Sequence, residues 1–168
     1  MITDEELVNE CCQGRKPAQR ELYERFAPMM LAVCMRYLPS RDEAQDAMHD
    51  GFIKVFEKIY TLRDAKVLED WIYHIMVNMS VDHLRKKREI VFDDLDVVPE
   101  IRMDYEPYSA QDLLASIQQL PHKYRLVFNL REVEGQSYEQ IANTLGIGLS
   151  SVRSTLCRAK QMLREMLM

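Results

Sequence analysis

Residues 137–165, SYEQIANTLGIGLSSVRSTLCRAKQMLRE, predict two helices joined by a tight turn. Ser137 and Gln140 have the spacing of a capping box, which favours a short helix over SYEQIANTL. Small glycines flank Ile147, and Gly146 can adopt the positive φ that commonly ends a helix. The turn is therefore expected to lie at these glycines, with a new helix directly after it.

That second helix is expected to begin at Ser150 or Ser151 and to bury one apolar stripe. The stripe has helical spacing and consists of Val152, Leu156, Ala159 and Leu163. The opposite face is expected to present basic and polar side chains, namely Arg153, Ser154, Cys157, Arg158, Lys160, Gln161 and Arg164. In a DNA-binding helix-turn-helix the second helix enters the major groove. A plain pair of helices with a solvated basic face is the alternative.

The charge distribution along the chain removes an apparent conflict with DNA binding. The 168 residues carry a net charge of -5, which taken alone argues against a nucleic-acid partner. Residues 89–120 are net -7, however, whereas residues 121–168 are net +3. Charges farther apart than about 8 Å are largely screened at physiological salt. The local basic face therefore matters more than the total.

The remaining sequence predicts an all-α protein made of two small helical domains joined by an acidic flexible linker. Capping boxes at Thr3 and Ser40 begin two helices, and a further helix is expected over about 18–37. Apolar residues recur at helical spacing over residues 48–59 and again over residues 71–79, with a short irregular stretch between them. Prolines and clustered acids without helical periodicity indicate a linker. The predicted domains are residues 1–88 and 109–168, with the linker at residues 89–108.

The end of the first domain carries a second candidate nucleic-acid surface. Its members are Asn78, Asp82, Arg85, Lys86, Lys87 and Arg88. Basic side chains bind phosphates, and an amide such as that of Asn78 can contact a base edge. The preceding segment TLRDAKVLED, residues 61–70, could hold an unstacked base. The alternative is structural, because cations at a helix C-terminus stabilise the helix dipole.

A third candidate surface is acidic and lies on the helix that follows Ser40. It comprises Asp42, Glu43, Asp46, His49, Asp50 and Glu57. Such a face suits docking to a basic protein surface, and a solvated helix face is the alternative. Asp46, His49 and Asp50 share a side of the helix, so a metal site is a further interpretation of this cluster. No second helix offers matching ligands, so no metal is expected.

Other composition features narrow the function classes. The four cysteines have neither zinc-site nor disulfide-framework spacing, which indicates unpaired thiols. The segment MITDEELVNE does not resemble a signal peptide, and no apolar run approaches the roughly 18 residues of a membrane span. We therefore expect a cytoplasmic protein without membrane insertion. No phosphate-cradling glycine loop is present, so neither a cofactor nor an ATP-driven step is expected.

Three segments together resemble one protein family. They are DEAQDAMHDGFIKVFEKI, DWIYHIMVNMSVDHLRKKR and LPHKYRLVFNLREVEGQSYEQIANTLGIGLSSVRSTLCRAKQMLRE. In this order they are similar to bacterial RNA polymerase sigma factors of the extracytoplasmic-function (ECF) group of the sigma-70 family. The resemblance implies a transcription initiation factor that binds core RNA polymerase, recognises the -10 and -35 elements of promoter DNA and opens the duplex. It also implies an anti-sigma factor as a partner.

The resemblance assigns roles to residues of this chain. Polymerase binding falls on Asp42, Glu43, Asp46, His49 and Asp50. Recognition of the -10 element falls on Leu62, Arg63, Lys66, Asn78, Asp82, Arg85, Lys86, Lys87 and Arg88. Recognition of the -35 element falls on Ser150, Ser151, Arg153, Ser154, Cys157, Arg158 and Lys160. Leu62 stands where some relatives carry an aromatic residue, and Thr155 stands where many carry arginine.

Two other functions stay open at this point. The chain could be a stand-alone helix-turn-helix regulator that binds DNA as a dimer. It could also be a helical metalloenzyme that uses Asp46, His49 and Asp50. The acidic linker is expected under the family interpretation, since in sigma factors this segment threads through polymerase channels that otherwise carry nucleic acid.

Overall fold

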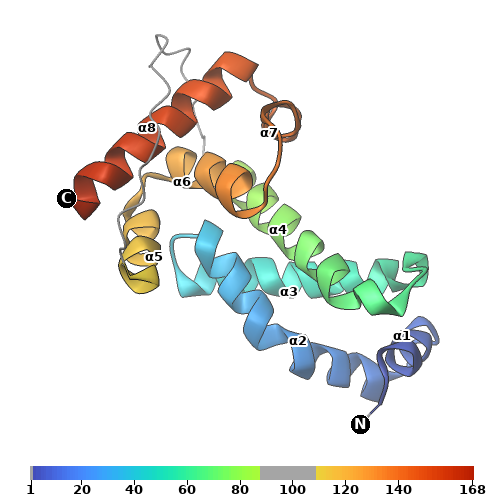
Figure 1. Ribbon diagram of the computed structural model, residues 1–168. Helices are drawn as coiled ribbons and strands as arrows, with labels where there is room; N and C mark the ends of the chain where they lie inside the picture. The colour runs from blue at the N-terminus through green and yellow to red at the C-terminus, as the bar shows by residue number, and fades with distance from the viewer. Residues whose placement is uncertain (1, 88–108) are drawn as a thin grey trace. The chain divides into compact units, whose positions relative to one another are not determined.

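The computed structural model describes residues 2–87 and 109–168, and every regular element in these two ranges is helical. The chain divides into two compact units, Met1–Arg88 and Glu89–Met168, coloured from blue to green and from yellow to red in Figure 1. The predicted all-α fold with two helical domains is confirmed. The predicted linker, residues 89–108, lies outside the described residues, so its acidic, flexible character and the predicted domain boundaries stay predictions.

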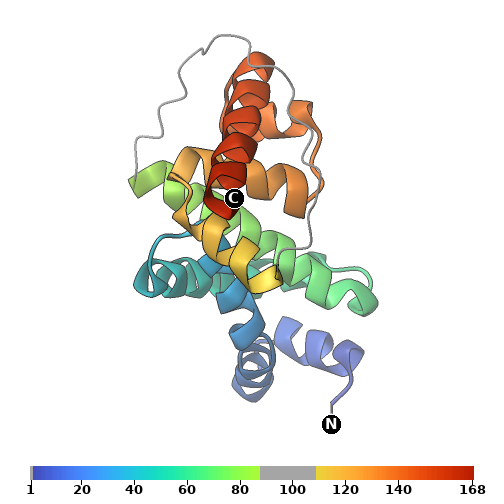
Figure 2. The ribbon, with the colours of Figure 1, turned by 60° about the vertical axis from the view of Figure 1, so that its left-hand side comes forward.

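The first unit is built on three long helices that pack against one another. These are α2 (Lys16–Tyr37), α3 (Arg41–Lys58) and α4 (Leu68–Lys87), and they can be followed in Figures 1 and 2. The shorter α1 (Asp4–Cys12) packs on α2. Two single 3-10 turns, η1 (Ile59–Thr61) and η2 (Ala65–Val67), connect α3 to α4. Large apolar side chains such as Leu22, Met30 and Ile72 are fully buried at the centre.

Local signals explain where these helices begin. Thr3 and Glu6 form the predicted capping box at the start of α1, and the Ser40 side chain accepts a hydrogen bond from the Glu43 backbone at the start of α3. Each cap satisfies backbone N–H groups that would otherwise lack a partner. Helix α2 begins at Lys16, two residues before the predicted start. Pro17 follows at once, and proline is tolerated in a first helical turn.

The second unit packs three shorter helices against one long one. Helices α5 (Ala110–Gln119), α6 (His122–Phe128) and α7 (Tyr138–Leu145) all contact α8 (Leu149–Leu167). Helix α6 continues into η3 (Asn129–Val133), a π-helical turn that the sequence did not indicate. The whole apolar stripe of α8, from Val152 to Leu163, is buried as predicted.

The turn between α7 and α8 has the geometry that its glycines indicated. Ser137 and Gln140 make the predicted capping box of α7, and Gly146 has φ 67°, the left-handed conformation that ends this helix. The predicted start of α8 at Ser150 or Ser151 is wrong by one to two residues. Gly148 is the N-cap in an extended conformation and Leu149 is the first helical residue, so neither serine caps this helix.

Within residues 2–87 and 109–168 there is no helix that is both long enough and apolar enough to cross a membrane.

The positive φ of Gly146 generates a stability prediction. An alanine Cβ at this position would meet no atom within 4 Å, so the cost of Gly146→Ala comes only from the left-handed backbone, roughly 1–2 kcal/mol. Chemical denaturation should show this loss in the free energy of unfolding. Gly148→Ala is the matched control, because Gly148 has φ -69°, and it should cost clearly less. Equal losses at the two glycines would contradict the assignment of strain to Gly146.

Candidate nucleic-acid and partner interfaces

The exposed side of α8 is narrower than helical spacing predicted. Arg153 and Ser150 are exposed, as expected for residues that contact a ligand. Ser151, Ser154 and Cys157 are buried, with relative exposures of 4%, 5% and 6%. The prediction that this face presents Ser154 and Cys157 is therefore wrong, because helical spacing places a residue on a side of the helix but does not show what covers that side. The Ser154 hydroxyl donates to the Ser151 carbonyl instead of facing outward.

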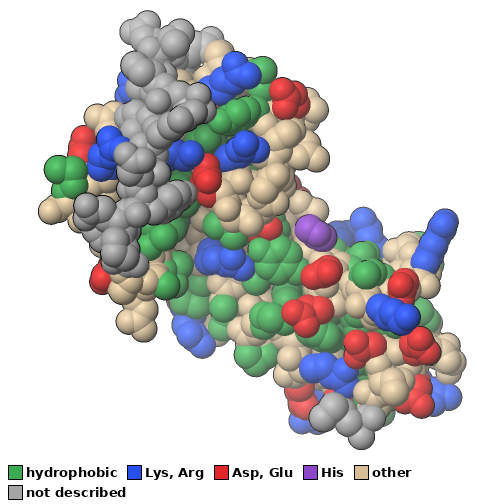
Figure 3. All heavy atoms as spheres, viewed as in Figure 1, with side chains coloured by type: hydrophobic (Ala, Val, Ile, Leu, Met, Phe, Trp, Pro, Cys, Tyr) green, Lys and Arg blue, Asp and Glu red, His purple; other side chains and the backbone are tan. Residues whose placement is uncertain are grey.

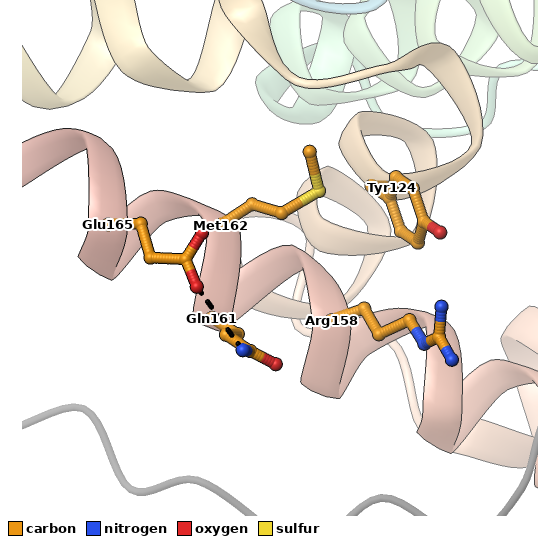
Figure 4. Close-up of a pocket in the computed structure, with 5 residues that line it drawn as sticks. All are labelled: Tyr124, Arg158, Gln161, Met162 and Glu165. Atoms are coloured by element: carbon orange, nitrogen blue, oxygen red, sulfur yellow. Dashed lines mark hydrogen bonds between the residues drawn. The ribbon is translucent and has the colours of Figure 1, made fainter.

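The other cations of α8 differ in their surroundings. Lys160 is half-buried, and its Nζ lies 2.8 Å from Glu132 Oε1 in an ion pair. Arg158 is also half-buried and lines a groove of about 280 Å³ together with Tyr124 of α6. Figure 4 shows the Arg158 guanidinium beneath the Tyr124 ring, with Met162 and Glu165 farther along the helix. Of the three α8 cations assigned to the -35 element, Arg153 is thus the exposed one.

A cluster that the sequence analysis missed surrounds Tyr138, the first residue of α7. The Arg131 guanidinium carbon lies 4.7 Å from the Tyr138 ring centroid, and the Arg153 guanidinium carbon lies 5.4 Å from the same centroid. Both distances are within the roughly 6 Å of a cation–π interaction. Arg131 Nη1 also donates to the Gln136 carbonyl at 2.8 Å. The sequence did carry a signal for this cluster. Tyr138 follows the capping Ser137 directly and has an arginine on either side of it along the chain.

The end of α4 presents the predicted polar face. Asn78, Asp82 and Arg85 are spaced by four and three residues and are all exposed, as is Lys86. The side chain of Lys87 and the whole of Arg88 lie outside the described residues. Side chains three and four residues apart share one helix face, so the described part of this cluster forms one continuous surface.

The segment between α3 and α4 exposes an aromatic residue that the sequence analysis did not select. The predicted residues Arg63 and Lys66 are exposed and Leu62 is half-buried. Tyr60, in η1, has a relative exposure of 74%. Helical periodicity did not reveal it, because the 3-10 turn interrupts the register of α3 just before this position. The segment therefore combines two cations with an exposed ring.

The acidic face of α3 is exposed, and one of its residues contacts α2. Asp42, Asp46, His49 and Asp50 are exposed, whereas Glu43 is half-buried. His49 Nε2 lies 3.2 Å from the Tyr23 hydroxyl of α2, and the two rings stack. Ile53, one turn after His49, is 56% exposed and was not predicted. On the face of the first unit seen in Figure 3, acidic and basic side chains are interspersed.

The thiols and carboxylates of the described residues offer little for metal chemistry. All four cysteines are free, as predicted, and only Cys12 is exposed. Burial raises the pKa of the Cys11 thiol to about 11 and also raises the pKa of the Cys34 thiol, which disfavours the thiolate that binds metals. In the ranges that the structure describes, no group of three or more His, Cys, Asp or Glu side chains is placed to hold a metal ion.

An all-α chain with a helix-turn-helix, a basic helix end and an acidic helix face defines a DNA-binding protein that also has a surface for a protein partner. Comparison with known families identifies it further. Residues 22–90 match Sigma-70 region 2, and residues 110–163 match Sigma-70, region 4. Each region covers most of one of the two described helical units. The chain belongs to the sigma-70 family of RNA polymerase sigma factors, in its ECF group.

Curated relatives agree with this membership. The chain is 29% identical over 182 residues to the ECF RNA polymerase sigma-E factor of Haemophilus influenzae, covering 98% of this chain and 95% of the relative. It is also 29% identical over 164 residues to the ECF RNA polymerase sigma factor SigE of Mycolicibacterium smegmatis. That match covers 92% of this chain and 63% of the relative's length.

Solved structures share the fold. The sigma factor RpoE in complex with the anti-sigma factor NepR from Bartonella quintana has a TM-score of 0.52 at 23% identity, covering 88% of this chain and 95% of that one. CnrH in complex with the cytosolic domain of CnrY has a TM-score of 0.51 at 20% identity, covering 98% of this chain and 96% of that one. Both likenesses concern the fold alone.

The Lys160–Glu132 ion pair generates a prediction for DNA binding. Glu132→Gln should release the Lys160 ammonium for a phosphate, and a partly exposed pair such as this one is worth about 0.2–1 kcal/mol. Duplex DNA should bind up to about 5-fold tighter in fluorescence anisotropy at low salt. Glu165→Gln is the control, since it also removes one negative charge but from a carboxylate that accepts from Gln161. An equal gain in the control would attribute the effect to net charge alone.

Proposed function

We propose that this protein is a transcription initiation factor that binds core RNA polymerase and directs it to specific promoters through the -10 and -35 elements. The observation that carries the proposal is the presence of both sigma-70 regions, in their family order, on one helical chain. The factor has no catalytic step of its own in this proposal, because the polymerase performs the chemistry. Since polymerase and promoter DNA lie in the bacterial cytoplasm, we place the protein there.

The first unit would carry two of the three interfaces. The acidic face of α3, with Asp42, Asp46, His49 and Asp50 exposed, is proposed as the surface that binds core polymerase. Glu43 is proposed for the same surface. The exposed end of α4 and the segment before it are proposed to bind the -10 element, with cations on phosphates and the Asn78 amide available to a base edge. Lys87 and Arg88 belong to the same proposal.

The second unit would bind the -35 element through the start of α8. The exposure of Arg153 supports it as the principal contact, because arginine can bind guanine through two hydrogen bonds in the major groove. Ser150 is also exposed. Ser151, Ser154 and Cys157 are buried, so contacts from them would require that this side of α8 becomes accessible.

An anti-sigma factor is proposed as a further partner. The structure of the sigma factor RpoE, which shares this fold, is a complex with the anti-sigma factor NepR, and this supports the proposal. A stand-alone dimeric regulator is not favoured, because it would leave the region 2 match without a role. The helical metalloenzyme is not retained, since His49 is engaged with Tyr23 and its carboxylate neighbours form no metal-binding group in the described residues.

Run-off transcription with purified core polymerase tests the proposed function. A pool of genomic promoter fragments is transcribed with and without the full-length protein. Promoter-dependent transcripts should appear only when the protein is added. The absence of such transcripts across the pool, with a working control sigma factor, would refute the proposal. Tight binding of duplex DNA by the protein alone, without any transcript, would favour the dimeric regulator instead.

The acidic face generates a binding prediction. Reversing two charges, Asp46→Lys with Asp50→Lys, places cations against a basic partner surface, where like charges are costly. The affinity for core polymerase should fall at least about 10-fold in a pull-down or anisotropy titration. The single reversal Asp46→Lys is also measured. Its control is Glu5→Lys, a single reversal on the exposed first turn of α1. Unchanged binding in the double variant would remove α3 from the interface.

The exposed ring of Tyr60 generates a prediction for promoter opening. Stacking of an unpaired base on an aromatic side chain is worth about 1–3 kcal/mol. Tyr60→Ala should therefore lower the yield of open complex at least about 5-fold, whereas Tyr60→Phe should retain it. Permanganate reactivity of unpaired thymines in the -10 element measures this yield. Met29→Ala, which also changes an exposed apolar residue but on α2, outside the proposed interfaces, is the control. Wild-type reactivity with Tyr60→Ala would exclude Tyr60 as the stacking residue.

A further inference from the structure

The cluster formed by Arg131, Tyr138 and Arg153 combines three separate helical elements around one ring. Arg131 comes from η3, Tyr138 begins α7, and Arg153 lies in the second turn of α8. The two guanidinium carbons lie 4.7 and 5.4 Å from the Tyr138 ring centroid. The two positive charges can therefore be no more than about 10 Å apart. The Tyr138 ring therefore brings Arg131, which lies outside the helix-turn-helix, next to Arg153 of α8.

The cluster lacks an internal counter-charge. Glu132, which follows Arg131, forms its ion pair with Lys160 instead. In the part of the chain that the structure describes, the polar and ring contacts of Arg131 are those with Tyr138 and the Gln136 carbonyl, and the contact of Arg153 is with Tyr138. Two neighbouring cations repel each other, and an anion that contacts both relieves this repulsion. The arrangement is therefore more favourable when a phosphate lies beside it.

The Tyr138 ring also limits the motion of the two side chains. A free arginine side chain loses up to about 2 kcal/mol of rotamer entropy when it is immobilised. Arg131 is anchored both by the ring and by its 2.8 Å bond to the Gln136 carbonyl. Arg153 is exposed and is held by the ring from one side. Preorganisation of this kind lowers the entropic cost of binding.

We propose that Tyr138 is a positioning residue that holds Arg131 and Arg153 together for binding a DNA phosphate at the start of α8. Arg131 thereby becomes a DNA contact that its position in η3 did not indicate. The proposal rests on the proposed function, because it concerns how the second unit binds promoter DNA. It adds that the exposed arginine of α8 does not act alone, and that its orientation depends on a residue of the preceding helix.

The first test observes the cluster in the full-length protein without DNA. Arginine Nε–Hε signals in NMR spectra, assigned with Arg131→Lys and Arg153→Lys, should show upfield shifts caused by the Tyr138 ring. These shifts should disappear in Tyr138→Leu and persist in Tyr138→Phe. Signals that are unshifted in the wild type, or that are unaffected by Tyr138→Leu, would overturn the proposal whatever the function of the protein.

The second test measures DNA binding and the coupling between residues. With a fluorescein-labelled duplex of random sequence, Tyr138→Leu should lower the affinity of the full-length protein about 5-fold or more, as expected for two lost cation–π contacts. The slope of log affinity against log salt should fall by about 1, the value for one lost phosphate contact. Tyr138→Phe should stay within about 2-fold of the wild type, because it keeps the ring.

A double-mutant cycle separates positioning from a general structural effect. In an Arg153→Ala background, Tyr138→Leu should have clearly less effect, because the side chain that it positions is absent. Equal effects in both backgrounds would overturn the proposal. Tyr124→Leu is the matched control, since Tyr124 also has a cation, Lys123, over its ring at 5.1 Å, and its effect should add to that of Arg153→Ala. Thermal unfolding checks that each variant is folded.

The outcomes distinguish this proposal from the proposed function. If wild-type protein supports promoter-dependent transcription but Tyr138→Leu binds DNA like the wild type, the positioning role alone fails. If the wild type neither supports transcription nor binds duplex DNA, the proposed function fails and the phosphate site fails with it. A coupled loss of affinity together with the loss of the shifted arginine signals supports the positioning role, whereas only promoter-dependent transcription supports the proposed function.

Discussion

Burial of one apolar stripe on α8 sets the orientation on which the whole second unit depends. Val152, Leu156, Ala159 and Leu163 have relative exposures of 3% or less, and their helix contacts α5, α6 and α7. Burying a valine or leucine side chain stabilises a fold by roughly 1.5–3 kcal/mol. Rotating α8 about its axis would expose the stripe. The side of the helix on which Arg153 lies is therefore fixed by residues that never contact a ligand.

The same constraint explains why the turn before α8 matters for binding. Gly146 ends α7 in a left-handed conformation, and Gly148 starts α8 in an extended one. Together they place Tyr138, at the far end of α7, within reach of Arg153. A helix-turn-helix is thus more than a scaffold for one exposed helix. Its first helix contributes an aromatic ring to the surface of the second.

Sequence reasoning succeeded where a short-range rule determines the structure. The capping boxes at Thr3 and Ser137, the left-handed Gly146 and the stripe from Val152 to Leu163 all follow from spacing within a few residues. The same rules supplied the all-α fold. They failed at η3, where a π-helical turn extends α6, because no local composition rule distinguishes such a turn from a regular one.

The functional surfaces were less predictable because their decisive contacts are between elements. Ser154 and Cys157 have the spacing of an outer face and are nevertheless buried. Lys160 was selected for its charge, but Glu132 of η3 already pairs with it. In each case the sequence gives the side chain's chemistry, while a residue elsewhere in the chain determines its availability.

The charge of this protein is consequently best described separately for each helix surface. The net charge of -5 suggests an anionic molecule, yet Arg153 and Arg131 lie together at Tyr138 and Asp46 and Asp50 lie together on α3. At physiological salt the Debye length of about 8 Å is comparable to the size of each surface. The binding of a DNA phosphate near Tyr138 therefore depends on the two arginines and not on the net charge of the protein. A protein with separate acidic and basic helix surfaces can in this way present one surface to a basic protein and others to an acidic nucleic acid.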